Sequence, residues 1–323
     1  MKAIQVSQVG EAGVLKVGNV FIDKPHVGQA LIRIEMSGVN YIDIYQRQGI
    51  YPIQLPYIPG LEGAGVVEEI GEKVTNVKVG DRVAFVHEPG AYAEKIIVTA
   101  DHLILLTTDL SFEQGAALPL QGMAAHYLLH EFREVKANDI VLVHAAAGGM
   151  GLLLVQWAKQ LGARVIGTVS TDEKALAALD AGADDIIMYT KKDFVEEVKK
   201  RTDRYGADII FDGVGKTTFE GNLQAAALRG TIVIYGAASG PAAPICPNVL
   251  MQRSLTVSGG SLFNFLLSKT ELLERANAVI KGIKQGWLHL KIDEVFPLER
   301  AADAQRKLEN RQTSGKVLLK IKS

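Results

Sequence analysis

The chain has almost no cysteine, no excess of either charge and no long apolar run. Cys246 is the single cysteine of 323 residues, which excludes a disulfide within the chain and a cysteine-rich zinc lobe. The 35 basic and 36 acidic residues nearly cancel, so we expect no dedicated nucleic-acid surface and no attraction to an anionic membrane. No apolar stretch has the length of a membrane span, and the first 20 residues lack the pattern of a signal peptide. These absences predict a cytoplasmic protein with no membrane partner.

What remains is ordinary globular sequence in sufficient length for about two domains. From Met1 to about Gly90, short alternating segments separated by glycine and proline predict antiparallel strands and turns. Residues 111–132 then have helical spacing, and the C-terminal part contains two further helical segments and a closing strand, "KVLLKI".

A strict alternation of strands and helices fills the middle of the chain. Six apolar strand candidates begin at Asp139, Ala163, Asp185, Ala207, Thr231 and Ser254, and helical segments separate the first five. Each of these helices is predicted to end at a glycine, namely Gly162, Gly182, Gly206 and Gly230, because glycine adopts left-handed φ without steric cost. The pattern predicts an α/β fold with a doubly wound six-stranded parallel (Rossmann) sheet over 124–260. This domain is inserted into a mainly antiparallel β domain of 1–123 and 261–323.

The glycine-rich stretch "HAAAGGMG" (144–151) follows the first strand of that sheet and opens the first helix. Ala146, Gly148 and Gly151 stand at the G-x-G-x-x-G spacing, with alanine in the first position. Gly148 permits close approach of a pyrophosphate, Gly151 permits close packing of helix on strand, and a helix starting near Gly151 directs its N–H groups at the phosphates. The alternative is a structural turn.

The end of the second strand favours NADPH over NADH. An NAD site usually has Asp or Glu about 20 residues after the glycines, to bind the ribose 2′-hydroxyl, whereas this chain has Thr168, Val169 and Ser170. Without that carboxylate a 2′-phosphate meets no repulsion, and Lys174 supplies positive charge. Ser170 also fits a helix capping box with Glu173, a role compatible with phosphate binding.

Several motifs together resemble one known family. They are "SGVNYIDIYQRQGIYP" (37–52), "PGLEGAGVVEEIG" (59–71), "VGDRV" (79–83), "HAAAGGMG" (144–151) and "FDGVG" (211–215). The chain resembles the zinc-independent quinone oxidoreductases (zeta-crystallin-like) of the medium-chain dehydrogenase/reductase superfamily. The resemblance implies that the antiparallel domain is GroES-like and catalytic. It also implies a homodimer that pairs the last strand of the nucleotide-binding sheet, "SLTVSGG".

The zinc ligands of related enzymes are missing. Leu61 stands where zinc-dependent relatives carry a histidine, and no cysteine lies in "MSGVNYID". His126 and His130 have i,i+4 spacing but no third ligand in view, so we interpret them as structural. We therefore expect no metal.

The resemblance implies hydride transfer from NADPH to a quinone or another electron-poor conjugated carbonyl, without metal. An NADPH-dependent enone or alkenal reductase is the alternative within this chemistry. An NADPH-binding structural or RNA-binding protein is the alternative outside it.

The resemblance also implies roles for particular residues. Asn40, Tyr45 and Tyr51 would be catalytic, with Asn40 beside the nicotinamide and the two tyrosines lining the acceptor pocket, although a turn role for Asn40 and ordinary packing of the tyrosines are the alternatives. The glycine loop would contribute Ala146, Gly148, Gly149, Met150 and Gly151 to cofactor binding, and Ser170, Lys174 and Tyr189 would bind the 2′-phosphate end. Tyr235, Gly236, Gly259 and Ser261 would border the nicotinamide half, and Arg311 would lie near the cofactor or be a helix-end surface cation.

Overall fold

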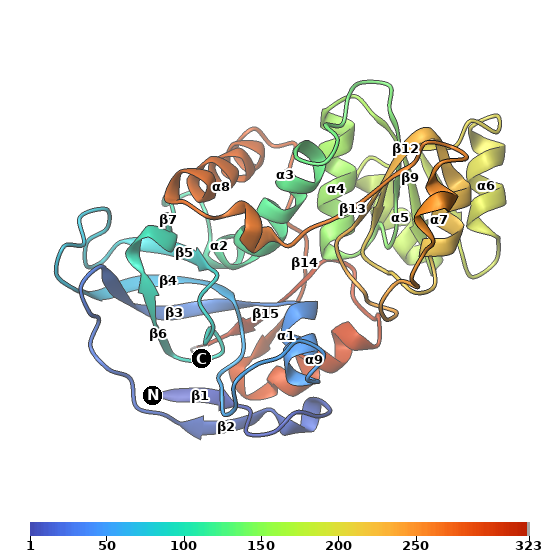
Figure 1. Cartoon of the computed structure of the whole chain (residues 1–323). Coiled ribbons are helices and arrows are strands. Elements are labelled where there is room, and N and C mark those ends of the chain that lie inside the picture. Colours follow the sequence, from blue (N-terminus) through green and yellow to red (C-terminus); the bar gives the residue numbers. More distant parts are fainter. Residues whose placement is uncertain (322–323) are drawn as a thin grey trace. The chain divides into compact units, whose positions relative to one another are not determined.

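The computed structural model describes residues 1–321 and contains two compact units (Figure 1). One unit consists of Met1–Met123, Leu266–Ile280 and the chain from Leu290 onwards; the other consists of Ala124–Phe265 and Lys281–His289. Each unit has its own sheet, so each is described separately.

The second unit is built on a six-stranded parallel sheet of order β10-β9-β8-β11-β12-β13. Its strands are β8 (Ile140–Val143), β9 (Arg164–Val169), β10 (Asp185–Met188), β11 (Ala207–Asp212), β12 (Ala226–Ile234) and β13 (Thr256–Gly259). The helices between them are α4 (Gly149–Gln160), α5 (Asp172–Asp180), α6 (Phe194–Arg201) and α7 (Phe219–Ala225), preceded by α3 (Met123–His130) (Figure 1). The predicted doubly wound sheet is confirmed, and the strand order reverses between β8 and β11, where such sheets bind ligands.

Three of the four predicted helix-ending glycines adopt left-handed φ. Gly162, Gly182 and Gly206 have φ of +85°, +105° and +99°. The prediction for Gly230 is wrong, because α7 ends at Ala225, Gly230 lies inside β12 and the preceding Arg229 has the positive φ, +63°. A Cβ at Gly230 would lie 2.9 Å from the carbonyl oxygen of Ala227, so glycine is needed there for close backbone approach.

The first unit is built on a mainly antiparallel sheet of order β14-β15-β3-β4-β5-β7, with β6 also paired to β3. The strands are β3 (Gln29–Val39), β4 (Glu62–Ile70), β5 (Arg82–Val86), β6 (Lys95–Thr99), β7 (Leu103–Leu105), β14 (Ile292–Pro297) and β15 (Lys316–Lys320), and β1 (Lys2–Gln5) pairs with β2 (Lys16–Asn19) in a separate ribbon. The helices of this unit include α1 (Tyr41–Arg47), α2 (Phe112–Ala117) and α9 (Ala301–Glu309). The long strand β3 pairs with β4, β6 and β15, and so joins the N-terminal and C-terminal parts of the unit.

Two helical segments differ in detail from the sequence pattern. The predicted helical run 111–132 forms α2, a π-helical turn at Leu118–Gly122 that contains Pro119, and then α3. The last turn of α8 (Lys269–Lys284) and the residues that follow it, Lys281–His289 together, belong to the parallel-sheet unit. Within that unit Gln156 donates a hydrogen bond to the His289 carbonyl oxygen (3.1 Å), and Trp287 contacts Trp157. The predicted limits of 124–260 for the nucleotide domain omit this segment.

Candidate functional site

The glycine loop leads from β8 into α4 at the point where the strand order reverses. Helix α4 begins at Gly149 with Gly148 as its N-cap, two residues before the predicted start. The first hydrogen bond of the helix is donated by Leu152 N to the Gly148 carbonyl oxygen (2.9 Å). The N–H groups of the three residues before Leu152 are therefore the donors that a helix leaves for an external acceptor. Such an N-terminus is suited to a phosphate.

The two glycines of the motif meet different surroundings. A Cβ at Gly151 would lie 2.7 Å from Ala146 Cα, so a side chain would push the helix away from the strand. A Cβ at Gly148 would meet only the Ala145 carbonyl oxygen, at 3.3 Å, and would fill space in front of the loop. Ala145 itself holds a left-handed φ of +51°, which turns the chain into the loop. This cradle fits the pyrophosphate of a dinucleotide.

Two of the residues predicted for the 2′-phosphate, Ser170 and Tyr189, follow the paired ends of β9 and β10, and the third, Lys174, lies in α5. Tyr189 N donates to the Val169 carbonyl oxygen (3.2 Å), and Thr190 Oγ1 donates to that of Ser170 (3.1 Å). The predicted capping box of Ser170 and Glu173 is wrong: Thr171 is the N-cap of α5, and its hydroxyl accepts from Lys174 N (3.3 Å). Thr171 has the extended backbone of an N-cap, and the helix begins one residue later than expected.

A buried polar network beneath this edge of the sheet was missed by the sequence analysis. His144, which follows β8, accepts from Thr168 Oγ1 at Nδ1 (3.0 Å) and donates from Nε2 to Asn222 Oδ1 (2.7 Å). Asn222 Nδ2 in turn donates to Asp212 Oδ2 (2.6 Å). Burial lowers the pKa of His144 and thus favours the neutral ring. The available signal was the position of polar residues at the carboxyl ends of apolar strands.

The remaining predicted residues of the parallel-sheet unit also lie at carboxyl ends of strands. Tyr235 follows β12, is half-buried, and packs so closely on Gly213 that a Cβ there would lie 2.7 Å from its ring. Burial raises the pKa of Tyr235. Gly236 follows it, Gly259 ends β13, and Ser261 lies two residues further on.

In the antiparallel-sheet unit, the three predicted catalytic residues lie on α1 and the turn after it. Asn40 is the N-cap of α1 and only 3% exposed. The rings of Tyr45 and Tyr51 pack edge to face with centroids 5.2 Å apart, and Tyr51 is 45% exposed. The paired tyrosine rings offer flat apolar faces and hydroxyl donors, which are suited to a flat polar ligand. Arg311, in the same unit, follows α9 with a left-handed φ of +58°.

Asn40 belongs to a charged cluster that the sequence did not reveal. Its carboxamide contacts the side chains of Glu62 and Lys316, which are 0% and 3% exposed. Glu62 lies in the motif of residues 59–71, which assigned it no role. No sequence pattern connects Lys316 with Glu62, because 254 residues separate the two.

A nearby carboxyl group is buried with few partners. Asp43 Oδ2 accepts hydrogen bonds from Asn40 N and from the Tyr92 hydroxyl, both at 2.9 Å. Burial raises the pKa of Asp43 to about 7, the main cause being loss of solvation for the charged form.

No group of three or more His, Cys, Asp or Glu side chains within residues 1–321 is arranged to hold a metal ion. The rings of His126 and His130 are tilted by 52° with centroids 4.7 Å apart, and both contact Trp157 edge to face. Over the same residues, no helix is both long and apolar enough to cross a bilayer.

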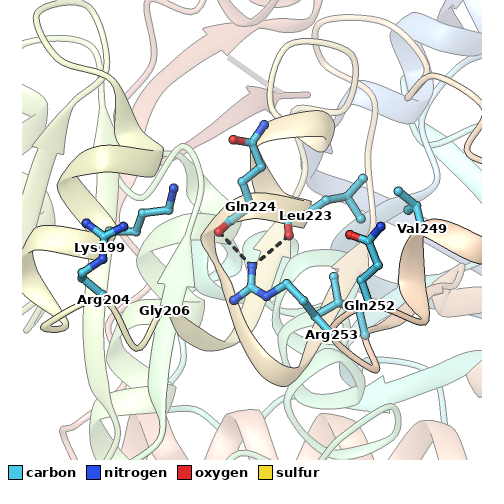
Figure 2. Close-up of a pocket in the computed structure, with 9 residues that line it drawn as sticks. Lys199, Arg204, Gly206, Leu223, Gln224, Val249, Gln252 and Arg253 are labelled. Atoms are coloured by element: carbon cyan, nitrogen blue, oxygen red, sulfur yellow. Dashed lines mark hydrogen bonds between the residues drawn. The ribbon is translucent and has the colours of Figure 1, made fainter.

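A hollow of about 360 Å³ lies near the amino ends of β11 and β13 (Figure 2). It is lined by Lys199, Arg204, Gly206, Leu223, Gln224, Val249, Gln252, Arg253 and Leu255, none of which was predicted to bind a ligand. Figure 2 shows the Arg253 guanidinium turned to the carbonyl oxygens of Leu223 and Gln224, at 3.3 and 3.0 Å. These hydrogen bonds complete the C-terminal turn of α7, so the arginine has a structural role.

Comparison with known proteins gives the chain its family. Residues 26–109 match the alcohol dehydrogenase GroES-like domain and residues 149–277 match the zinc-binding dehydrogenase family. A quinone oxidoreductase of Pseudomonas aeruginosa is 38% identical over 321 residues, which cover 98% of this chain and 99% of that protein. The chain belongs to the quinone oxidoreductases of the medium-chain dehydrogenase/reductase superfamily.

Two further relatives bear on the chemistry. A 2-haloacrylate reductase of a Burkholderia species is 40% identical over 309 residues, covering 93% of both chains. The crystal structure of the Escherichia coli quinone oxidoreductase complexed with NADPH superimposes with a TM-score of 0.97 at 36% identity, covering 99% of this chain and 100% of that one.

Proposed function

We propose that this protein is an NADPH-dependent quinone oxidoreductase. The observation that carries the proposal is the glycine cradle at the start of α4 combined with the absence of an acidic residue at the end of β9. The family membership and the NADPH complex of a structural relative support it.

The residues present fit NADPH. Ala146, Gly148, Gly149, Met150 and Gly151 would hold the pyrophosphate at the N-terminus of α4, and Ser170, Lys174 and Tyr189 would hold the 2′-phosphate. Since Thr171 is the N-cap of α5, the Ser170 hydroxyl does not cap that helix. Tyr235, Gly236, Gly259 and Ser261 would border the nicotinamide half, and Arg311 would lie near the cofactor. When bound, NADPH supplies the hydride.

The acceptor would be an electron-poor flat molecule. A quinone that takes up one hydride and one proton becomes a hydroquinone, and negative charge develops on its oxygen during reduction. Hydrogen bonds from the Tyr45 and Tyr51 hydroxyls and the Asn40 amide would stabilise that charge. Since Leu61 stands where zinc-dependent relatives carry a histidine, we expect donors alone to polarise the acceptor, which would then have to be electron-poor before it binds.

A spectrophotometric assay tests this proposal. NADPH oxidation by simple quinones is expected to be at least about tenfold more efficient than NADH oxidation, and a chelator is expected to leave the rate unchanged. A preference for NADH, or loss of activity with chelator, would contradict the assignment. Because one relative is a 2-haloacrylate reductase, conjugated carbonyls and acrylates are assayed in parallel, and a saturated product with no turnover of quinones would favour double-bond reduction.

Lys174→Ala sharpens the cofactor assignment. Loss of the ammonium is expected to weaken NADPH binding about tenfold, with little change for NADH, because only NADPH carries the 2′-phosphate. Lys200→Ala removes an exposed lysine of α6 and serves as the control. Equal losses for both cofactors would contradict the role of Lys174.

The protein is expected to be a cytoplasmic homodimer. Strand β13 ends the parallel sheet, and its outer edge could pair with the same strand of a second copy across a two-fold axis. Light scattering on a size-exclusion column measures the mass directly, and a monomeric mass would refute the dimer.

A further inference from the structure

A closed triangle of hydrogen bonds surrounds the side-chain amide of Asn40. Lys316 Nζ donates to Glu62 Oε1 (2.5 Å) and to Asn40 Oδ1 (2.7 Å). Asn40 Nδ2 donates to the same Glu62 oxygen (2.7 Å). The amide oxygen thus faces a cation, and the amide nitrogen faces an anion.

Glu62 is itself held from several elements. Its second carboxylate oxygen accepts from Leu120 N (2.7 Å), in the π-helical turn that follows α2. On the other side, a Cβ at Gly38 of β3 would lie 2.7 Å from Glu62 Cδ, so any side chain at position 38 would displace the carboxylate. A carboxylate fixed in this way is a rigid reference for the groups bonded to it.

The triangle allows only one orientation of the Asn40 amide. A 180° flip would turn the NH2 group toward the Lys316 ammonium and the carbonyl oxygen toward the Glu62 carboxylate, and both contacts would be repulsive. In the observed orientation, one Nδ2 hydrogen is used by Glu62. The second is the hydrogen that the triangle leaves for another acceptor.

We propose that Lys316 and Glu62 are positioning residues for the reduction, which fix the Asn40 amide so that its second Nδ2 hydrogen is presented as a donor to the reacting complex. This inference rests on the proposed function. A buried ion pair is by itself a poor source of stability, because desolvation offsets the attraction between the charges. The positioning role predicts a result that a purely structural pair would not give.

The decisive variant removes both charges. Glu62→Leu and Lys316→Met are each expected to lower the melting temperature and kcat, because each leaves one charge buried without its counterion. The double variant Glu62→Leu/Lys316→Met is expected to recover most of the melting temperature while kcat stays about 10- to 100-fold below wild type and KM for NADPH changes less than about threefold. Recovery of kcat together with stability would overturn the proposal.

Two further measurements complete the test. In Asn40→Ala/Lys316→Met, the losses in kcat are expected not to multiply, because Lys316 acts through Asn40; multiplying losses would overturn the proposal. Lys2→Met, which breaks the exposed Lys2–Glu299 pair of the same unit, is the matched control.

The side-chain amide signal of Asn40, assigned by its loss in Asn40→Ala, gives a readout independent of activity. In a ¹H–¹⁵N spectrum it is expected to be protected from exchange in wild type and to lose that protection in the double variant. A signal indifferent to Lys316 would overturn this proposal. The two proposals can fail separately. If the wild-type protein reduced no quinone but the Asn40 signal responded as expected, the proposed function would be overturned, whereas the conclusion that Lys316 and Glu62 hold the Asn40 amide in place would be supported.

Discussion

The two units bury a carboxylate in opposite ways. Glu62 of the antiparallel-sheet unit is neutralised by the Lys316 ammonium, and its partners Asn40, Leu120 and Lys316 are brought together from distant parts of the chain. Asp212 of the parallel-sheet unit has four uncharged donors, all from the following ten residues: Val214 N (2.7 Å), Gly215 N (3.0 Å), Thr218 Oγ1 (2.8 Å) and Asn222 Nδ2 (2.6 Å). An anion can thus be stabilised by one long-range countercharge or by several local dipoles.

The largest loss of stability is expected at Glu62, because a single countercharge, the Lys316 ammonium, neutralises its carboxylate. Lys316→Met leaves Glu62 buried without a countercharge and should lower the free energy of unfolding by about 3–5 kcal/mol. Urea unfolding is followed by far-UV circular dichroism, because both tryptophans, Trp157 and Trp287, lie in the other unit. Lys2→Met should leave the midpoint almost unchanged, since that ion pair is exposed. If Lys316→Met lowered the free energy of unfolding by less than about 1 kcal/mol, Glu62 would not depend on its single countercharge, and the proposed difference between Glu62 and Asp212 would be contradicted.

Asp43 is a third buried carboxyl group, and within residues 1–321 it has two hydrogen-bond donors and no ion pair; the attraction of the nearby Lys316 ammonium offsets only part of the effect of burial. Its Oδ1 has no hydrogen-bond partner within residues 1–321. The pKa of Asp43 is about 7 in the folded protein against 3.8 in the unfolded chain. Between pH 4 and 7 the unfolded chain has therefore lost the proton that the folded protein still holds, so a rise in pH through this window lowers stability.

Asp43→Asn should abolish this pH dependence. The free energy of unfolding of the variant, relative to wild type, is expected to increase by about 2–4 kcal/mol from pH 4 to pH 7.5, as measured by urea unfolding across that range. Asp23→Asn, at an exposed position of the same unit, should show no such trend. A constant difference between Asp43→Asn and wild type would show that Asp43 is ionised throughout.

A smaller loss is expected where four donors share one anion. Thr218→Ala removes one of the hydrogen bonds to Asp212 and should cost about 1 kcal/mol, because the other three remain. Tryptophan fluorescence reports the unfolding of this unit. Thr218→Ser retains the hydroxyl and should lose less. A loss as large as that of Lys316→Met would mean that the donors of Asp212 cannot substitute for one another.

The same difference between local and distant partners explains what the sequence could predict. The parallel sheet was predictable because each strand, glycine turn and helix is encoded within a few tens of residues. The errors in the predicted local structure were small. The N-cap hydroxyl of α5 belongs to Thr171, one residue after the predicted Ser170. Gly230 was expected to have a left-handed φ, but it is needed for close backbone approach. Both conformational needs select glycine, so the residue type alone could not separate them.

The candidate site was less predictable where it depends on distant partners. The glycine loop and the missing acid at Ser170 were visible as local patterns. Lys316 was not, since nothing near "SGKVLLK" indicates that its ammonium contacts Asn40. The roles of Asn40, Tyr45, Tyr51 and the cofactor-binding residues stay predictions until variants are measured.

The pyrophosphate of the cofactor would be a fourth anion, stabilised like Asp212 by nearby uncharged N–H groups. Gly148→Ala tests this with little expected effect on folding, because the new Cβ would contact only the Ala145 carbonyl oxygen, at 3.3 Å. Stability should stay within about 1 kcal/mol of wild type, since alanine is a poorer N-cap than glycine, whereas NADPH binding, followed by nucleotide fluorescence, should weaken at least about tenfold. Gly151→Ala, whose Cβ would lie 2.7 Å from Ala146 Cα, should instead destabilise the unit itself. Wild-type NADPH affinity in Gly148→Ala would mean that the phosphates bind elsewhere, and the resemblance between the cofactor site and the Asp212 site would be lost.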